Sequence, residues 1–283
     1  MNSQQHGVVA VSETVMPACE QATAKSRAIW SVGKVMGSAP QLGSLLVGIV
    51  AWEILGWALD FPFLPPFSRV IVAWWELFQE GKLVGNLLAS LTAMVIGFSL
   101  AATVGLTVGI FMGLSESVEH LLELYVNAFL ASPSIAYVPV FYIFFGISNA
   151  TRIAVVFWYA FWIIIVNART AIRCVDADLV EMARSFGANR RQILWKVMLP
   201  NALPLIMAGF RLGVGRAVKG MINGEMFIAL VGLGAMVRYY GGAFDVEHLL
   251  AVLLNILVVA LIAAGIVQAI DNRLTRWQEP TGA

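Results

Sequence analysis

Charged residues are scarce in this chain. Asp, Glu, Lys and Arg make up only 12% of its 283 residues, whereas 59% are hydrophobic. A soluble fold of this size cannot hide so large an apolar fraction in its core. The composition therefore predicts a chain embedded in a membrane. The chain also lacks a basic surface with interleaved aromatic residues, which argues against binding to nucleic acid.

Cysteine and histidine are also rare. The chain has two cysteines, Cys19 and Cys174, and three histidines that are scattered along the sequence. Their spacing matches no metal site, and none lies beside a candidate nucleophile. Both cysteines fall on the cytoplasmic side in the topology derived below, where thiols stay reduced, so we expect no disulfide. The sequence predicts neither a cofactor nor a metal in this chain.

A phosphate-binding loop of the form G-x-x-x-x-G-K-[ST] is absent as well. Gly33-Lys34 is followed by Val35, and Gly81-Lys82 is followed by Leu83. The chain therefore cannot cradle ATP phosphates in this manner, because the loop supplies the backbone N–H groups and the lysine that hold them. If ATP drives its activity, another subunit must hydrolyse it.

Long apolar runs are present instead. About 20 apolar residues in a helix cross the hydrocarbon layer. Suitable runs occupy residues 42–59, about 92–114, 124–150, 153–168, about 202–224 and 249–270. The chain is therefore predicted to be an all-α integral membrane protein with six transmembrane helices. Residues 1–40 form a polar N-terminal tail, 41–276 the membrane domain and 277–283 a C-terminal tail.

The distribution of lysine and arginine predicts the orientation. With a cytoplasmic N-terminus, the outer segments hold only Arg69, Lys82, Arg152 and Arg238, while the inner segments hold most of the others. Basic residues accumulate in cytoplasmic loops. Both termini and the loop at 169–200 are therefore expected in the cytoplasm.

Three segments have sequence patterns that predict how their helices pack, lie or bend. Small residues four positions apart, from Gly97 to Gly113, form a seam on which another helix can pack closely. Residues 70–81, between the first two spans, have one apolar face and predict an interfacial helix on the outer surface. In the third span, Pro133 and Pro139 flank Tyr137 and predict a kinked or broken helix. Such a break is tolerated against a water-filled cavity, so these residues are candidates for the wall of a pathway.

The fifth span contains charges at membrane depth, which are costly and indicate function by default. Arg216, Lys219 and Asn223 share one helical face, whereas Glu225 points roughly the opposite way. The shared face could present cations to an anionic solute. Alternatively, Arg211 or Arg216 pairs with a carboxylate or with helix-end carbonyls, and Arg211 near the cytoplasmic end could extend towards the interface.

The most informative segment is the loop before the fifth span. Glu181, Ala183, Gly187, Leu199 and Pro200 occupy a specific spacing within a polar, basic stretch. Residues 181–186 and 188–198 can each form a helix, and Gly187 can adopt the positive φ that ends the first of them. The spacing resembles the EAA loop of bacterial ABC-importer permeases. Pro133 to Ile147 and Gly215-Arg216-Ala217 with Glu225 are also similar to the nitrate, taurine and alkanesulfonate group of these permeases, from which Lys219 and Asn223 depart.

The resemblance implies a type I ABC-importer permease fold in a bacterial inner membrane, with the EAA loop as the contact for the ATPase. It implies a second copy of the permease, two ATP-binding subunits that hold ATP and Mg²⁺, and an extracytoplasmic solute-binding protein. The expected function is ATP-driven import, by alternating access, of a small anionic solute such as a sulfonate, nitrate or carboxylate.

Two other functions remain open at this point. An ion-coupled secondary transporter would work without a nucleotide hydrolase. An integral-membrane enzyme would use Glu53, Arg216, Lys219 and Glu225 as a buried acid–base site, which requires titratable groups within hydrogen-bonding reach of each other.

Overall fold

The computed structural model describes residues 38–59, 61–228 and 231–275, and over these ranges it is helical without a β-strand. The predicted terminal tails lie almost wholly outside the described residues. The elements are α2 (Ser38–Leu59), α3 (Phe67–Gln79), α4 (Lys82–Leu114), α5 (Glu116–Ala131), the 3₁₀ turn η1 (Ser134–Tyr137), α6 (Val138–Phe145), α7 (Asn149–Arg173), α8 (Ala177–Ser185), α9 (Arg190–Ile193), the π-helical turn η2 (Leu194–Met198), α10 (Leu199–Ile228), α11 (Leu233–Gly242) and α12 (Val246–Leu274).

Five of the six predicted spans fall within helices, whereas the third, 124–150, is interrupted. Four helical segments are long and apolar enough to cross a membrane. These are α4, α7, the continuous segment Arg190–Phe227, and α12. A fifth span arises if α5 and the segment Ser134–Phe145, which are bent by 99° relative to each other, count as one. The first predicted span corresponds to a shorter apolar helix, Gly43–Leu59. The 99° bend between α5 and Ser134–Phe145 confirms the break predicted in the third span.

The prolines of that span act differently from each other. Pro133 follows the end of α5 and stands at the N-cap of η1. Pro139 lies in the first turn of α6, where the missing N–H has no partner to lose. The predicted end of this span at residue 150 is wrong, because Gly146 ends α6 with φ +64° and Ser148 caps α7.

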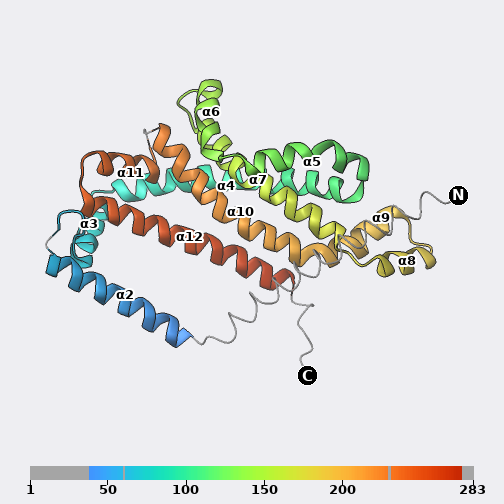
Figure 1. The fold of residues 1–283 in the computed structure, drawn as a ribbon, viewed down its shortest axis with the longest axis horizontal. Helices are drawn as coiled ribbons and strands as arrows, with labels where there is room; N and C mark the ends of the chain where they lie inside the picture. The colour runs from blue at the N-terminus through green and yellow to red at the C-terminus, as the bar shows by residue number, and fades with distance from the viewer. Residues whose placement is uncertain (1–37, 60, 229–230, 276–283) are drawn as a thin grey trace.

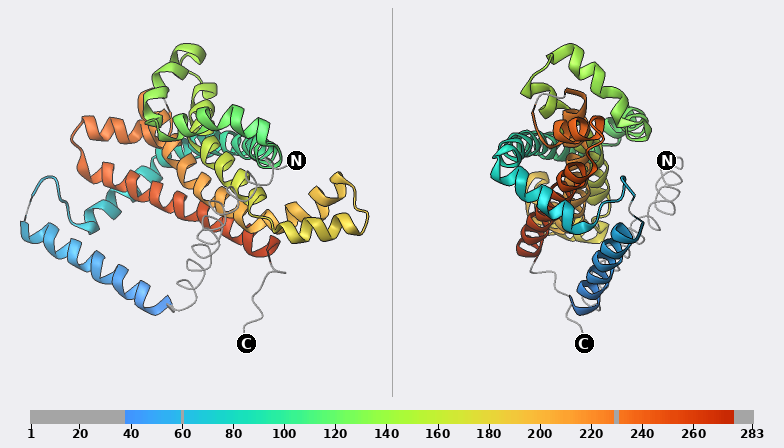
Figure 2. Two further views of the ribbon diagram at one scale, coloured as in Figure 1. Left: turned by 45° about the vertical axis from the view of Figure 1, so that its right-hand side comes forward. Right: turned by 90° about the vertical axis from the view of Figure 1, so that its left-hand side faces the viewer.

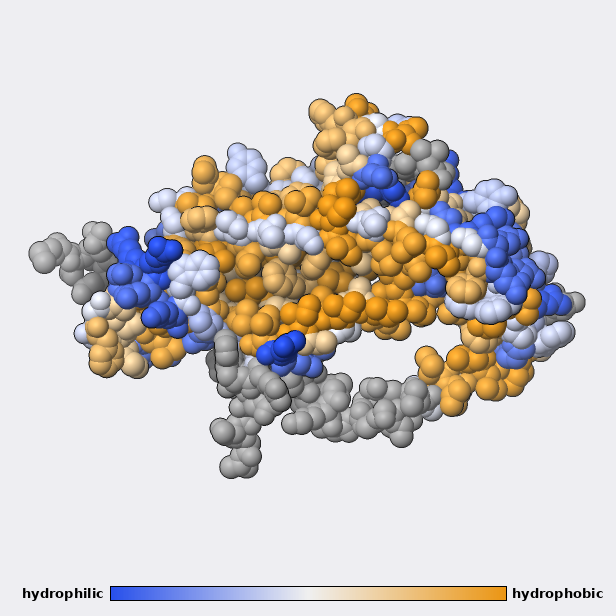
Figure 3. All heavy atoms as spheres, turned by 180° about the vertical axis from the view of Figure 1, so that it is seen from behind, coloured by the Kyte–Doolittle hydropathy of each residue, from blue (hydrophilic) through white to orange (hydrophobic). Residues whose placement is uncertain are grey.

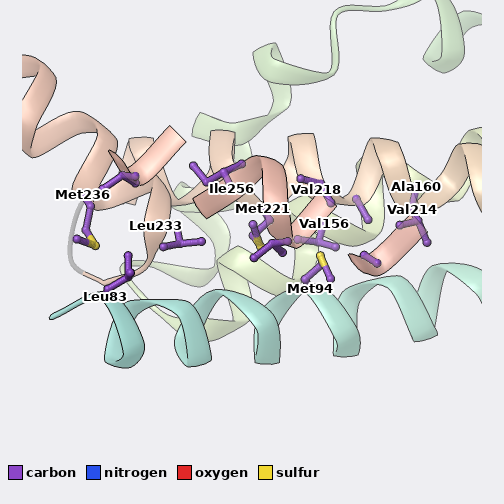
Figure 4. Packing of buried hydrophobic residues seen from close by; sticks show 14 of the residues in the cluster. Leu83, Met94, Val156, Ala160, Val214, Val218, Met221, Leu233, Met236 and Ile256 are labelled. Carbon is purple, nitrogen blue, oxygen red and sulfur yellow. The ribbon is translucent and has the colours of Figure 1, made fainter. Parts of the chain in front are cut away.

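The main core cluster draws buried residues from α3, α4, α7, α10, α11 and α12, and Figure 4 shows part of it. The predicted seam on α4 is buried at Gly97, Ala101, Gly105 and Gly109. A Cβ atom on Gly109 would lie 2.6 Å from the Ala168 Cβ atom of α7. Only small residues allow the two backbones to approach this closely, so the seam fixes how α4 and α7 pack.

Short helices lie at both ends of the molecule. Figures 1 and 2 place α8 and α9 at one end, and α3 and α11 at the other. Figure 3 shows a broad hydrophobic surface between two hydrophilic ends, as expected for a chain that spans a membrane. Helix α3, predicted to be interfacial, packs one face against α12 with Val70, Ala73 and Leu77 buried, and it leaves other large apolar side chains exposed, namely Ile71, Val72, Trp75 and Phe78.

One expectation about cysteine is wrong. Cys174, which follows the last turn of α7, is disulfide-bonded in the structure, although we expected both thiols to remain reduced. Cys19 lies outside the described residues.

Candidate functional site

The loop predicted to contact an ATPase folds as two helices joined by a tight turn. Asp176 caps α8 by accepting a hydrogen bond from the Asp178 N–H group. Gly187 follows the end of α8 with φ +78°, a conformation that favours glycine. Asn189 and Gln192 then form a reciprocal capping box at the start of α9. The helix, turn and second helix expected from the sequence are all present.

A π-helical turn joins this second helix to α10. The Leu199 N–H group bonds to the Leu194 carbonyl, five residues earlier. Pro200 has no N–H group, so the regular bond to the Lys196 carbonyl cannot form, and the wider turn precedes it. Leu199 itself packs on a buried cluster that includes Ala171 and Ile206. Leu199 and Pro200 therefore connect the loop rigidly to the membrane helix.

The outer surface of this two-helix segment combines apolar and basic side chains. Phe186 is 85% exposed, Trp195 is 64% exposed and Met182 is 53% exposed. Arg184, Arg190, Arg191 and Lys196 are exposed beside them, as is Glu181. A hollow of about 350 Å³ lies between the two helices, and its lining includes Ala183, Gly187 and Lys196. Large exposed apolar side chains on a polar end of the molecule are typical of a protein contact.

The second group of predicted residues lies on α10. Arg216 and Lys219 are exposed on one face of this helix, together with Leu212 and Gly215. In the part of the chain that the structure describes, neither cation has an ion-pair partner. Arg211 differs, because it forms an ion pair with Asp271 of α12. The pairing alternative thus holds for Arg211 and for neither of the other two cations.

Within the described ranges, Asn223 is the one member of this face that bonds to a side chain on another helix. Its amide nitrogen donates a hydrogen bond to the Tyr159 hydroxyl of α7, at 2.9 Å. Tyr159 in turn packs against Val138, which begins α6, and against Val155. The α10 face and the broken span therefore meet at Tyr159, a residue that the sequence did not single out.

The broken span is held by aromatic packing. Tyr137 lies 4.9 Å from the ring of Trp158 and 5.9 Å from that of Phe129, measured between ring centroids. Phe129 also stacks on Trp162 at 4.7 Å. Pro133 and Pro139 are exposed. Tyr137 is thus part of the packing that fixes the bend, while both prolines face outward.

Glu225 points away from the α10 cations, as its position predicts, and it is fully buried. It pairs with Arg152 of α7 at 3.5 Å, and it accepts hydrogen bonds from the Ser90 hydroxyl at 2.7 Å and the Gly234 N–H group at 3.0 Å. Ser90 also accepts a bond from the Leu233 N–H group. This buried cluster joins α4, α7, α10 and α11.

The sequence placed Arg152 in an outer loop and missed the pair. A basic residue at the start of an apolar run, opposite a lone buried carboxylate in a later span, was the only indication available. Its partner is 73 positions away in the sequence.

The residues of the hypothetical acid–base site do not meet. Glu53 accepts hydrogen bonds from Trp57 and from both the N–H group and the hydroxyl of Ser68, so it orders the start of α3. Glu225 lies in the separate cluster described above. Within the described residues no group of His, Cys, Asp and Glu side chains could hold a metal ion.

Comparison with known proteins gives a consistent result. Residues 105–276 match the family model described as "Binding-protein-dependent transport system inner membrane component". The taurine transport system permease protein TauC of Escherichia coli (strain K12) is 32% identical over 243 residues, which cover 83% of this chain and 88% of TauC. The riboflavin transport system permease protein RibX of Chloroflexus aurantiacus is 32% identical over 244 residues, with 84% and 91% covered.

The fold is also similar to that of a solved structure, the MetNI methionine ABC transporter in an inward-facing conformation. The TM-score is 0.61 at 21% sequence identity, and the match covers 68% of this chain and 94% of that one.

Proposed function

Because the chain belongs to the family of binding-protein-dependent transport system inner membrane components and is a multi-pass permease subunit of an ABC importer, we propose that two copies enclose a pathway for a small organic anion. Membership of this family decides against an ion-coupled secondary transporter and against an integral-membrane enzyme. The proposal places the chain in a bacterial inner membrane, with both termini and the α8–α9 segment in the cytoplasm.

The exposed cations on α10 are the main observation that supports a pathway along this helix. Arg216 and Lys219 lie in a membrane-spanning segment and are exposed in the single chain. A charged side chain facing lipid at this depth costs about 2.5–3.5 kcal/mol or more. A second copy packed around this face would give both cations a water-filled lumen instead. The exposed face of α10 is therefore assigned to the pathway between the two copies.

The α8–α9 segment is assigned to the contact with the ATP-binding subunits. Its exposed Phe186 and Trp195 offer apolar anchors, and its arginines surround them. Each of two permease copies would present one such segment to one of two ATPases, which carry the ATP and Mg²⁺. Closure of the ATPases would then move α10 through Leu199 and Pro200, coupling two global states by a direct contact.

The cations favour an anionic solute, delivered by an extracytoplasmic binding protein. A sulfonate or carboxylate would be attracted by the point charge of Lys219 and oriented by Asn223. TauC, a relative over most of the chain, is a permease for taurine, which is a sulfonate. RibX, equally similar, is a permease for riboflavin. Family membership therefore does not identify the solute, and the proposal of an anion is based on the residues of α10.

The test compares Lys219→Met with the wild type in vesicles that contain the complete transporter and its binding protein. The substitution keeps most of the side-chain volume and removes the charge, so taurine uptake should fall about tenfold or more. Assembly with the ATPases and their basal ATP hydrolysis should persist. Lys82→Met, which removes an exposed lysine paired with Glu80 outside the α10 face, serves as the matched control.

Two results would contradict the proposal. Uptake by Lys219→Met at the wild-type rate would remove Lys219 from the pathway. Preference of the wild type for solutes that carry no sulfonate, carboxylate or other anionic group would exclude an anion site. Copurification tests the assembly separately. A tagged permease that never retains an ATPase in several mild detergents would contradict the proposed partners.

A further inference from the structure

Tyr159 of α7 lies between α6 and α10, and the pathway assignment above gives it no role. Its ring packs against α10 at Gly220, where an added Cβ atom would lie 2.9 Å from the Tyr159 Cβ and Cγ atoms. Gly220 thus provides the space that lets the ring cross from α7 towards α10. The residue is only 8% exposed, so its side chain is held by packing.

The hydroxyl of Tyr159 retains a hydrogen to donate. Its oxygen accepts the bond from the Asn223 amide at 2.9 Å. A phenolic hydroxyl both accepts and donates, and among the described residues its hydrogen has no acceptor. Placing a tyrosine hydroxyl inside a membrane domain is costly unless the group is satisfied, and a ligand with acceptor oxygens would satisfy it.

The surroundings of this hydroxyl indicate where such a ligand would come from. Lys219 is exposed on α10 one helical turn before Asn223, so the two side chains lie on the same face. Val138, from the broken span, shares a buried cluster with Tyr159, and Phe141 of the same span packs against this cluster. The face of α10 that carries the cation and the amide therefore meets the broken span at Tyr159, and the sequence marks that span as a candidate wall of the pathway.

We propose that Tyr159 is a specificity-determining residue of the transport pathway, whose hydroxyl donates a hydrogen bond to an oxygen of the solute's sulfonate or carboxylate group. Lys219 supplies the charge. Asn223 orients the solute indirectly, because its hydrogen bond to Tyr159 fixes the position of the hydroxyl. This inference rests on the proposed import of an organic anion. It adds a neutral donor on α7 that recognises the oxygen atoms of the solute, in addition to the charge.

The test is Tyr159→Phe in the complete transporter with its binding protein, with taurine as the solute. The variant keeps the ring and its packing on Gly220 and removes only the hydroxyl oxygen. Taurine imported per ATP hydrolysed should fall about tenfold, as expected when a charged acceptor loses one donor. ATP hydrolysis stimulated by the loaded binding protein, and the melting temperature of the complex, should stay near the wild-type values. Tyr239→Phe, on an exposed tyrosine of α11, is the control.

A second variant tests the hydrogen bond between the two residues. Asn223→Ala should lower taurine import per ATP, and Tyr159→Phe should have little additional effect in that background, because Asn223 acts through the same hydroxyl. If the two substitutions lowered taurine import per ATP by factors that simply multiply in the double variant, Asn223 would not act through the Tyr159 hydroxyl.

Three outcomes separate the possibilities. Wild-type import per ATP in Tyr159→Phe overturns the inference. Parallel loss of ATP hydrolysis or of thermal stability assigns Tyr159 a structural role and also overturns it. Failure of the wild-type transporter itself to import taurine or any other sulfonate or carboxylate overturns the anion assignment, and it is seen without any variant.

Discussion

Gly187 sets the angle between the two helices of the cytoplasmic segment. Its φ of +78° strains any β-branched residue by about 1–2 kcal/mol, although a Cβ atom there would meet no other atom within 4 Å. A larger side chain at this position would therefore meet no steric clash among the described residues, and backbone strain is the effect that remains. We expect Gly187→Val to insert normally and to lose ATP-driven uptake in vesicles, because α8 no longer presents the same surface. Gly187→Asn, which tolerates positive φ, should retain more uptake. Normal uptake by the valine variant would contradict the docking role.

The buried pair of Arg152 and Glu225 predicts a large effect at a second residue. Glu225→Ala leaves Arg152 buried without its counter-charge and also removes an acceptor from Ser90 and Gly234. We expect a destabilisation of about 3–5 kcal/mol, measured as thermal unfolding of the detergent-solubilised protein. The control is Glu247→Ala, which breaks the exposed pair with Arg69 and should cost about 1 kcal/mol or less. Equal losses in the two variants would show that the cluster contributes little.

At the scale of helices, the α4 seam makes the packing with α7 sensitive to small changes. A Cβ atom on Gly109 would also lie 2.7 Å from the Ile165 carbonyl oxygen, which cannot move without distorting α7. Gly109→Leu should therefore lower the melting temperature of the purified protein, with an overpacking cost of about 1–3 kcal/mol. Gly85→Leu, at the open end of the same helix, should have a much smaller effect. A similar loss in both variants would contradict the role of the seam, because leucine raises helix propensity at both positions and only Gly109 faces α7 closely.

The helices also show which parts of the fold sequence can predict. The apolar runs locate the spans because, in lipid, the backbone N–H and C=O groups of an apolar segment must bond within its own helix. Gly187 marks a turn because glycine readily adopts positive φ, and the prolines mark breaks because they fix φ and lack an N–H group. The 99° bend, the π-helical turn before Pro200 and the link between Asn223 and Tyr159 depend on contacts between segments far apart in sequence. The helical period was enough to predict which way Glu225 points. It could not predict that Arg152 is its partner, because the two residues lie 73 positions apart in the sequence.

At the scale of the whole molecule, the two hydrophilic ends predict an orientation in the membrane. The α8–α9 segment carries Arg184, Arg190 and Arg191 at one end, and the turn between α11 and α12 lies at the other (Figure 1). Basic loops stay on the cytoplasmic side because translocating them is unfavourable. The exposed positions Ser185 and Gly242 report on the two ends.

Labelling of single cysteines tests this orientation. In a background with Cys19 and Cys174 replaced by serine, a membrane-impermeant maleimide should label Gly242→Cys in intact spheroplasts and Ser185→Cys only in inverted vesicles. Gly242 has no atom within 4 Å of an added Cβ, so cysteine should fit there without disturbing α11. Because the ATPases must reach α8 and α9 from the cytoplasm while the binding protein reaches the other end, the proposed import requires this labelling pattern. The reverse pattern would place the α8–α9 segment outside the cell, where no ATPase could contact it.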